Sequence, residues 1–335
     1  MKLKLRLELL RPGDIILIGY NDRRARVIQG KTNSKYSHAM LVWYDSIIHA
    51  ADLVITENPS RLLFDTDEAV CILRLKEQPG NEIKIKLLIE YARQFVGTLY
   101  DTDALKSLIR GNTPAYNVNR QMCSKFVAQC YEYVYSDLVD DYETCSPQDL
   151  YESNMVEIIE DVLTEANEWD VMYAESPNVT KLQYDAILTF IKELYKIHPE
   201  ADIMSLMQLE TYIEQHPEES DSITELLLST DYFNLWAKEA ECCPYLYDKQ
   251  KFKEFWKDSQ IQQALNIQES STRIISEKKA EIGYYLNQIQ KMGDLKYYHY
   301  MLDLNNNIIS NAYKRIEIAE RVLLDNKIVK IKLPK

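Results

Sequence analysis

The pattern of apolar and polar positions in the first part of the chain is typical of a small antiparallel sheet. Residues 15–19 form a short apolar run after a turn signal at 11–14, which suits a buried strand. Residues 37–44 and 46–51 are expected to be the two arms of a hairpin that turns at Asp45 and Ser46. Further strands are predicted at 1–10, 53–57 and 69–75.

Helical spacing appears between these strands and after them. Residues 23–29 suit a short helix, and residues 82–95 have an apolar face that Gly97 should end. Apolar residues recur at helical spacing from Cys123 to Tyr135. Strands and helices in this order predict an α+β domain with a small antiparallel sheet.

The second part of the chain has only helical periodicity. Apolar stripes lie within 184–194, 223–228, 275–289 and 308–323, and prolines fall between the amphipathic segments. Six of the eight glycines lie in the first 111 residues, so turn-rich structure gives way to long helices near residue 160. We therefore expect a mixed domain over 1–160 and an all-α helical bundle over 161–335, with 327–333 as a single strand or an exposed arm.

Charge and composition exclude several classes of protein. The formal net charge of −13 argues against a nucleic-acid-binding surface. No apolar run approaches the length of a membrane span, and the first ten residues lack the apolar core of a signal peptide. The six cysteines show no CxxC pair and no metal-ligand spacing with the five histidines. We expect a reduced, cytoplasmic protein without metal or cofactor, although delivery as an effector without a signal peptide stays open.

Cys123 is the first candidate for chemistry. It follows a polar, turn-prone segment at 113–120 and is expected in the first turn of a helix. Unpaired backbone N–H groups and the helix dipole favour an anion there, and the thiolate is the nucleophilic form of cysteine. The competing interpretation is a small buried packing residue, because free cysteines are commonly buried.

Two histidines, His38 and His49, lie on the two arms of the predicted hairpin. His38 would take the thiol proton as general base, and His49 would accept the other ring N–H of His38 and fix its tautomer. Either histidine alone also fits a hydrogen-bonded, half-buried residue. If His49 is not the third residue, Asp14 and Glu57 are the next candidates.

Six segments in this order resemble the circularly permuted papain-like enzymes of the NlpC-type superfamily. The resemblance is greatest to the YiiX-like branch, and the lecithin:retinol acyltransferases are relatives. In this permuted branch the histidine strand precedes the cysteine helix, as it does here. The segments are the opening turn and strand at 11–17, the histidine segment at 32–39, the polar residue within 48–50, and the motifs at 96–101, 122–127 and 145–150.

The resemblance implies a catalytic site of Cys123, His38 and His49. His49 departs from the YiiX-like branch, in which glutamate is commoner at this place, whereas histidine occurs in other NlpC-type peptidases and in the acyltransferases. The backbone N–H of Cys123 is a natural oxyanion donor. Tyr100, Tyr116 and Ser124 are further candidates for oxyanion or substrate binding, although packing roles are commoner for tyrosine in a chain with 24 of them.

The sequence therefore predicts a cysteine hydrolase or acyltransferase that forms an acyl-enzyme at Cys123. An amide, an ester or a thioester could be attacked, because the same triad serves all three. The rival interpretation is a retired papain-like fold that acts as a binding or scaffold protein. In either case the helical half could recruit a protein partner.

Overall fold

The computed structural model describes residues 1–76, 81–110 (without the side chains of 108 and 109), 120–135, 138–199, 203, 205–257 and 259–326. The chain divides into two compact units. The first consists of Met1–Ser176 with His198–Leu209, and the second of Pro177–Ile197 with Glu210–Lys335. Each unit is described separately below.

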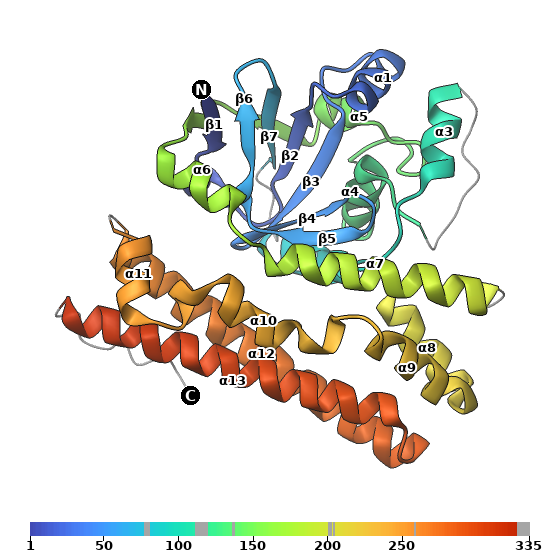
Figure 1. Ribbon diagram of the computed structural model, residues 1–335. Helices are drawn as coiled ribbons and strands as arrows, with labels where there is room; N and C mark the ends of the chain where they lie inside the picture. Colours follow the sequence, from blue (N-terminus) through green and yellow to red (C-terminus); the bar gives the residue numbers. More distant parts are fainter. Residues whose placement is uncertain are drawn as a thin grey trace. The chain divides into compact units, whose positions relative to one another are not determined.

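The first unit contains two antiparallel sheets (Figure 1). The larger sheet has the strand order β5-β4-β3-β2-β7-β8, and the smaller one has the order β6-β1-β9. Strands occur at each place where the apolar pattern predicted one, whereas β6, β8 and β9 were not predicted. The bounds are β1 Lys2–Leu5, β2 Ile15–Gly19, β3 His38–Trp43, β4 Ser46–Ala50, β5 Val54–Glu57, β6 Leu63–Asp65, β7 Ala69–Leu75, β8 Val156–Ile159 and β9 Leu163–Glu165.

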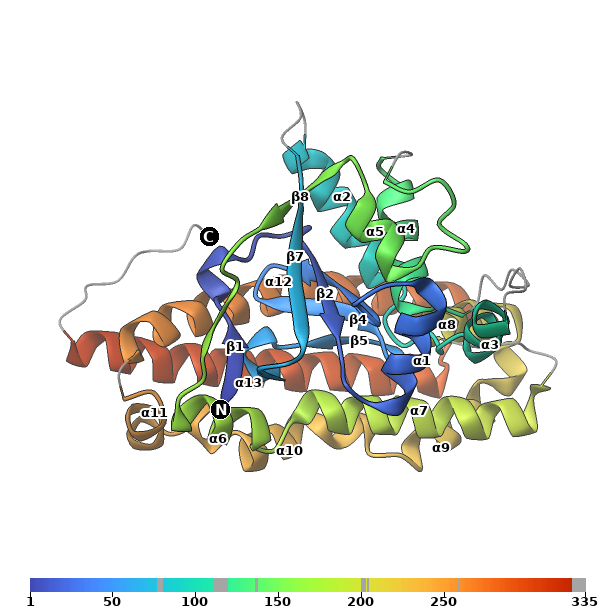
Figure 2. The ribbon, with the colours of Figure 1, turned by 90° about the horizontal axis from the view of Figure 1, so that it is seen from above.

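Both faces of the larger sheet are buried, because alternate residues of its strands enter two different cores. Along β2, Ile15 and Leu17 belong to a core cluster shared with helices, whereas Ile16 and Ile18 pack in a cluster with β1 and β6. Figure 2 shows α2, α4 and α5 grouped on one side of β2 and β7, and β1 on the other. These helices are α2 Asn81–Arg93, α4 Cys123–Glu132 and α5 Pro147–Glu152.

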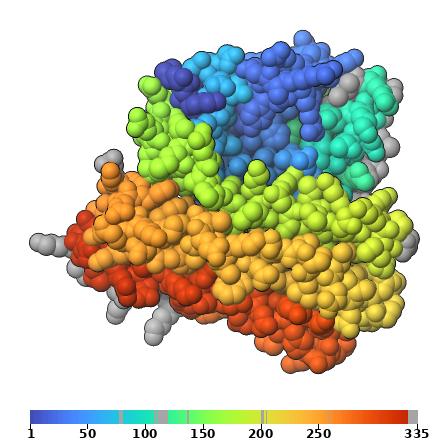
Figure 3. All heavy atoms as spheres, viewed as in Figure 1, coloured from blue at the N-terminus to red at the C-terminus, as the bar shows by residue number. Residues whose placement is uncertain are grey.

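The described residues of the first unit also form the helices α1, α3 and α6. The predicted helix after β2 is α1 (Arg23–Thr32), which begins at an Asp22 cap and continues past Gly30. α6 (Glu168–Glu175) lies against β1 in the space-filling view (Figure 3), where Lys4 Nζ pairs with Asp170 Oδ1 at 2.7 Å. α3 covers Thr102–Arg110, and short 3₁₀ helices cover Leu7–Leu9 and Pro59–Arg61.

The second unit is helical throughout its described residues. Its longest helices, α12 (Gln260–Met292) and α13 (Lys296–Asp325), run side by side around a small core of Ile275, Ile309 and Ala312 (Figures 1 and 2). The remaining helices are α7 Val179–Ile197, α9 Ser220–Leu228, α10 Leu235–Cys242 and α11 Lys249–Phe255, while α8 (Leu206–Gln215) crosses the division between the units.

The structure confirms the α+β class. The four predicted apolar stripes fall within α7, α9, α12 and α13. The strand β9 and the helix α6 lie beyond residue 160 but belong to the first unit, so the mixed part of the chain extends further than the glycine pattern indicated. The predicted strand or arm at 327–333 lies outside the described residues. None of the described helices has an apolar stretch long enough to cross a bilayer.

Substitution of Phe126 would measure how much the packing of α4 contributes to the stability of the first unit. The Phe126 side chain is fully buried and meets Phe95 edge-on. Phe126→Ala is expected to lower the free energy of unfolding of the first unit by about 3 to 5 kcal/mol, because it removes a buried ring and leaves a cavity. Urea denaturation would measure this loss. Val27→Ala, at an exposed position of α1, should change stability by less than about 0.5 kcal/mol.

Candidate active site

Cys123 is the first residue of α4 and only 4% exposed. The preceding residue, Met122, has extended backbone and gives no side-chain cap to the helix. The backbone N–H groups of Ala39 and Ser124 are close enough to the cysteine sulfur to lower the pKa of its thiol. The sulfur therefore occupies the place where a helix start offers unpaired donors.

The pairing of β3 and β4 stops before it reaches the two histidines. The ladder between β3 and β4 runs from Trp43 opposite Ser46 to Leu41 opposite Ile48, and goes no further. Val42 donates its N–H to Asp14 on the β2 side, so by alternation the N–H of Ala39 points toward β4. The N–H of Ala39, which helps to lower the pKa of the Cys123 thiol, is therefore directed into the gap where the ladder ends.

His38 and His49 meet beside this gap. His38 Nε2 lies 2.9 Å from His49 Nδ1, and the two rings are nearly perpendicular, at 86°. His49 is buried and His38 is half-buried. By strand alternation both histidines are on the face opposite α4. Cys123 belongs to the core cluster on the α4 side of the sheet, together with Ala39, the residue that follows His38.

Burial sets the charge state of these groups. Burial raises the pKa of the Cys123 thiol, and the N–H groups of Ala39 and Ser124 and the charge of Arg24 only partly oppose it. Burial also holds the pKa of His38 well below its usual value, and His49 and Arg24 lower it further. At neutral pH the free site is thus a neutral thiol beside a neutral imidazole, rather than the resting thiolate that the helix start alone indicated.

A pocket of about 240 Å³ opens beside the two histidines. Tyr20 contributes its ring, 6.1 Å from that of His38, and Arg24 lies over the ring of Tyr100 at 4.8 Å. The sequence analysis missed Arg24 and Tyr20, because an exposed position on α1 and a residue just after a strand carry no periodic signal. The other lining residues are Asp22, Ala25, Ile28, Ser37, Ala50 and Ala51.

The remaining residues singled out from the sequence have different positions. The Tyr100 ring lines the pocket, and burial raises the pKa of its hydroxyl. The Ser124 hydroxyl donates to the Cys145 carbonyl at 2.6 Å, so its side chain ties α4 to the segment before α5. Glu57 Oε2 lies 3.5 Å from His49 Nε2. Tyr116 lies outside the described residues.

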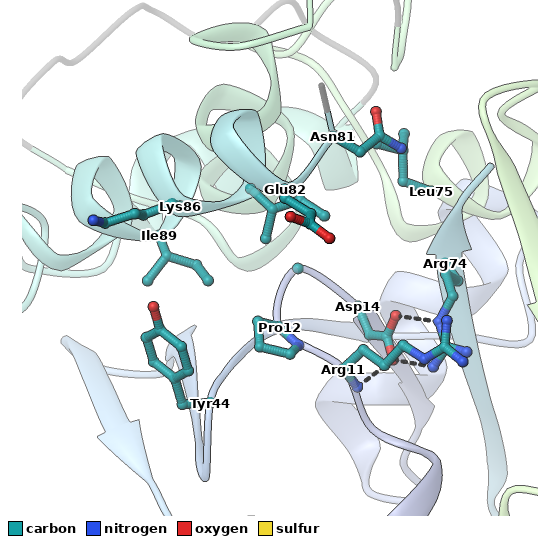
Figure 4. Close-up of a pocket in the computed structure, with 12 residues that line it drawn as sticks. Arg11, Pro12, Asp14, Tyr44, Arg74, Leu75, Asn81, Glu82, Lys86 and Ile89 are labelled. Carbon is teal, nitrogen blue, oxygen red and sulfur yellow. Dashed lines mark hydrogen bonds and ion pairs between the residues drawn. The ribbon is translucent and has the colours of Figure 1, made fainter. Parts of the chain in front are cut away.

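Asp14 is part of a second, separate cavity of about 420 Å³, near the start of β2. Figure 4 shows its carboxylate facing Arg74, with Nη2 and Oδ2 2.7 Å apart, and accepting from the backbone N–H of Arg11. The Asp14 side chain is only 2% exposed. Because both carboxylate oxygens are bound there, Asp14 is not available to orient His38.

One group of three potential metal ligands occurs among the described residues. It consists of His216, Glu218 and Glu219 in the second unit. The three residues are half-buried or exposed, and Glu219 Oε2 already accepts from the Tyr212 hydroxyl at 2.9 Å. Cys123, His38 and His49 do not contribute to it.

A cysteine at a helix start and two strand histidines in contact are the features that the sequence resemblance predicted. Residues 9–173 match the family model described as "Permuted papain-like amidase enzyme, YaeF/YiiX, C92 family". The N-terminal part of this chain is therefore a permuted papain-like domain of a hydrolase family, as the six sequence segments predicted.

The chain is also similar to a solved structure. The solved structure of the metalloprotein yiiX from Escherichia coli O157:H7 is similar with a TM-score of 0.34 and 16% identity. The similarity covers 44% of this chain and 96% of that one. A search of curated proteins gave no match.

The charge state of the site predicts how Cys123 reacts with iodoacetamide in the absence of substrate. Because burial raises the thiol pKa, labelling of Cys123 should be slow at pH 7 and rise through a midpoint above the ordinary value of 9.0. Arg24→Gln should move that midpoint higher still, since the charge of Arg24 lowers this pKa. Peptide mass mapping over a pH series measures both midpoints. Cys242, the only cysteine that is not buried, serves as internal reference. A midpoint below pH 7 would contradict the neutral thiol.

Proposed function

We propose that the first unit is a cysteine hydrolase that forms an acyl-enzyme at Cys123. The observation that carries the proposal is the contact between His38 and His49 at the end of the β3–β4 ladder. Ala39, the residue that follows His38, is close enough to the helix-start sulfur of Cys123 to lower the pKa of its thiol. The amidase description of the matched family favours an amide as the bond attacked, while ester and thioester substrates remain open.

The reaction begins with a proton transfer from thiol to imidazole. His38 Nε2 is in contact with His49, so Nδ1 is the ring nitrogen that takes the proton of Cys123. The sulfur then attacks the carbonyl carbon, and the imidazolium gives the proton to the leaving group. Water, deprotonated by the same imidazole, attacks the acyl-enzyme and releases the acid, which restores the thiol.

Backbone donors at the start of α4 would stabilise the charge that develops. The N–H groups around the Cys123 sulfur are fixed by the helix and the strand, so they need no rearrangement during the reaction. Arg24 lines the pocket with its guanidinium over Tyr100, and its positive charge favours the thiolate over the thiol. The free site therefore stays neutral, and charge appears only while the reaction proceeds.

The second candidate function is binding without catalysis. The buried, neutral Cys123 is the observation that favours it, because a retired nucleophile would also be a buried packing residue. In that case the helical unit would recruit a protein partner. Turnover of a small amide or ester probe separates the two functions, since a scaffold protein would not hydrolyse the probe.

Substitutions should rank the catalytic residues. Cys123→Ala should abolish turnover, and His38→Ala should be nearly as severe, because a neutral thiol needs a base. His49→Ala should be milder than either, although loss of an orienting residue costs roughly 10⁴-fold in serine proteases. His49→Glu should retain more activity than His49→Ala, since a carboxylate can accept the same N–H. Initial rates with amide, ester and thioester probes measure the series.

The control is Cys242→Ala, which changes a cysteine of the second unit and should leave the rates unchanged. Intact-protein mass after a rapid quench should show an acyl adduct on the wild type and none on Cys123→Ala. Full activity of His49→Ala with a substrate that Cys123→Ala cannot turn over would remove His49 from the mechanism.

A further inference from the structure

We infer that Glu57 is a positioning residue for the proposed reaction, because it selects the tautomers of His49 and His38 that leave His38 able to act as a base. Only the predicted effect of Glu57 on the reaction rate rests on the proposed function. The proton positions that it assigns hold whether or not the protein turns over a substrate.

Strand pairing brings Glu57 to the outer nitrogen of His49. In the register of β4 and β5, His49 lies opposite Ile55 and Glu57 lies opposite Ile47. Glu57 is therefore the diagonal neighbour of His49 on the same face of the sheet, within reach of a long side chain. The side chain of His49 is 7% exposed and that of Glu57 is 25% exposed, so the carboxylate approaches from the solvent side.

His49 Nε2 lacks a hydrogen-bond partner within the described structure, although it is buried. Leaving a buried polar atom unpaired is costly. Glu57 Oε2, at 3.5 Å, is too distant for a good hydrogen bond, but Glu57 is the carboxylate that forms an ion-pair contact with this nitrogen. Catalytic hydrogen bonds are commonly long in unliganded enzymes and shorten with substrate. A small rotation of the partly exposed Glu57 side chain closes the distance.

Only one arrangement of protons in this row of groups supports catalysis. A carboxylate at His49 Nε2 favours a proton on that nitrogen, which leaves His49 Nδ1 as an acceptor. His38 Nε2 then donates its proton to His49 across the 2.9 Å contact, and His38 Nδ1 carries the lone pair that takes the thiol proton. In the opposite arrangement His49 Nε2 would present a lone pair to the carboxylate, and His38 Nδ1 would already be protonated.

The first test reads the tautomers directly. Nitrogen-15 NMR of histidine-labelled full-length protein should show His49 protonated on Nε2 and His38 protonated on Nε2. Glu57→Met, which keeps the size but removes the acceptor, should mix the tautomers of both rings. Glu57→Gln, which keeps an acceptor oxygen without the charge, should give an intermediate spectrum. Unchanged tautomers in Glu57→Met would overturn the inference.

Glu68→Met is the matched control. Glu68 and Glu57 both raise the pKa of Tyr20 through their charges, so both substitutions remove a negative charge from the same neighbourhood. Glu68 accepts from the backbone N–H of Asp65 and is not in contact with either histidine. Its substitution should leave both tautomers unchanged. That result would show that Glu57 acts through its contact with His49 and not through the loss of a negative charge nearby.

The second test is a double-mutant cycle on kcat/KM. Glu57→Met should lower kcat/KM by roughly 10-fold or more, in kcat rather than in KM, because it acts on the base and not on binding. In a His49→Glu background the same substitution should cost nothing, since the new carboxylate accepts directly from His38. An equal loss in both backgrounds would overturn the inference. If no variant and no wild-type protein turns over a probe, the proposed function fails while the NMR result still decides the role of Glu57.

Discussion

The end of the ladder between β3 and β4, beside Ala39, is the feature on which the candidate site depends. A strand N–H that has lost its neighbouring strand must find another acceptor or water. The ladder between β3 and β4 ends at Leu41 and Ile48, and the N–H of Ala39 is close enough to the Cys123 sulfur to lower the pKa of its thiol. His38, one residue before Ala39, has its position fixed by the same strand. A rigid strand locates such groups more precisely than a loop does.

Burial and reactivity oppose each other at this point. A 4% exposed thiol is a stable core residue, and ionising it at rest would require a buried charge without a fixed counter-ion. The helix start, the Ala39 amide and the charge of Arg24 each reduce that cost without removing it. The site is therefore stable in its neutral form, and in the proposed reaction charge appears only when a proton moves to His38. This arrangement is expected when N–H donors stabilise the charged state formed during a reaction more than they stabilise the neutral resting site.

The sequence predicted the parts of the fold that have a local signal. The β3–β4 hairpin has two apolar runs around a two-residue turn, and α4 lies in a segment with apolar residues at helical spacing after a polar segment. The short strands β6, β8 and β9 have three or four residues each, and they pair with distant parts of the chain. Val156, for example, lies opposite Leu75, and no local pattern reveals that partnership. Arg24 was missed for a similar reason, because its role arises only when α1 packs beside the pocket.

The contact between the two histidines depends on a turn that neither of them touches. Because side chains alternate along a strand, a slip of one residue between β3 and β4 would move His49 to the other face of the sheet. The register is fixed by the link between Trp43 and Ser46, in which Tyr44 adopts a φ of 48°. A residue other than glycine in this left-handed region costs roughly 1 kcal/mol or more, so the surrounding structure must compensate for it. Both faces of these strands are buried, and a slipped register would expose apolar residues of two cores at once. The hydrophobic packing of the sheet, rather than any contact within the site, is therefore what holds His38 and His49 together.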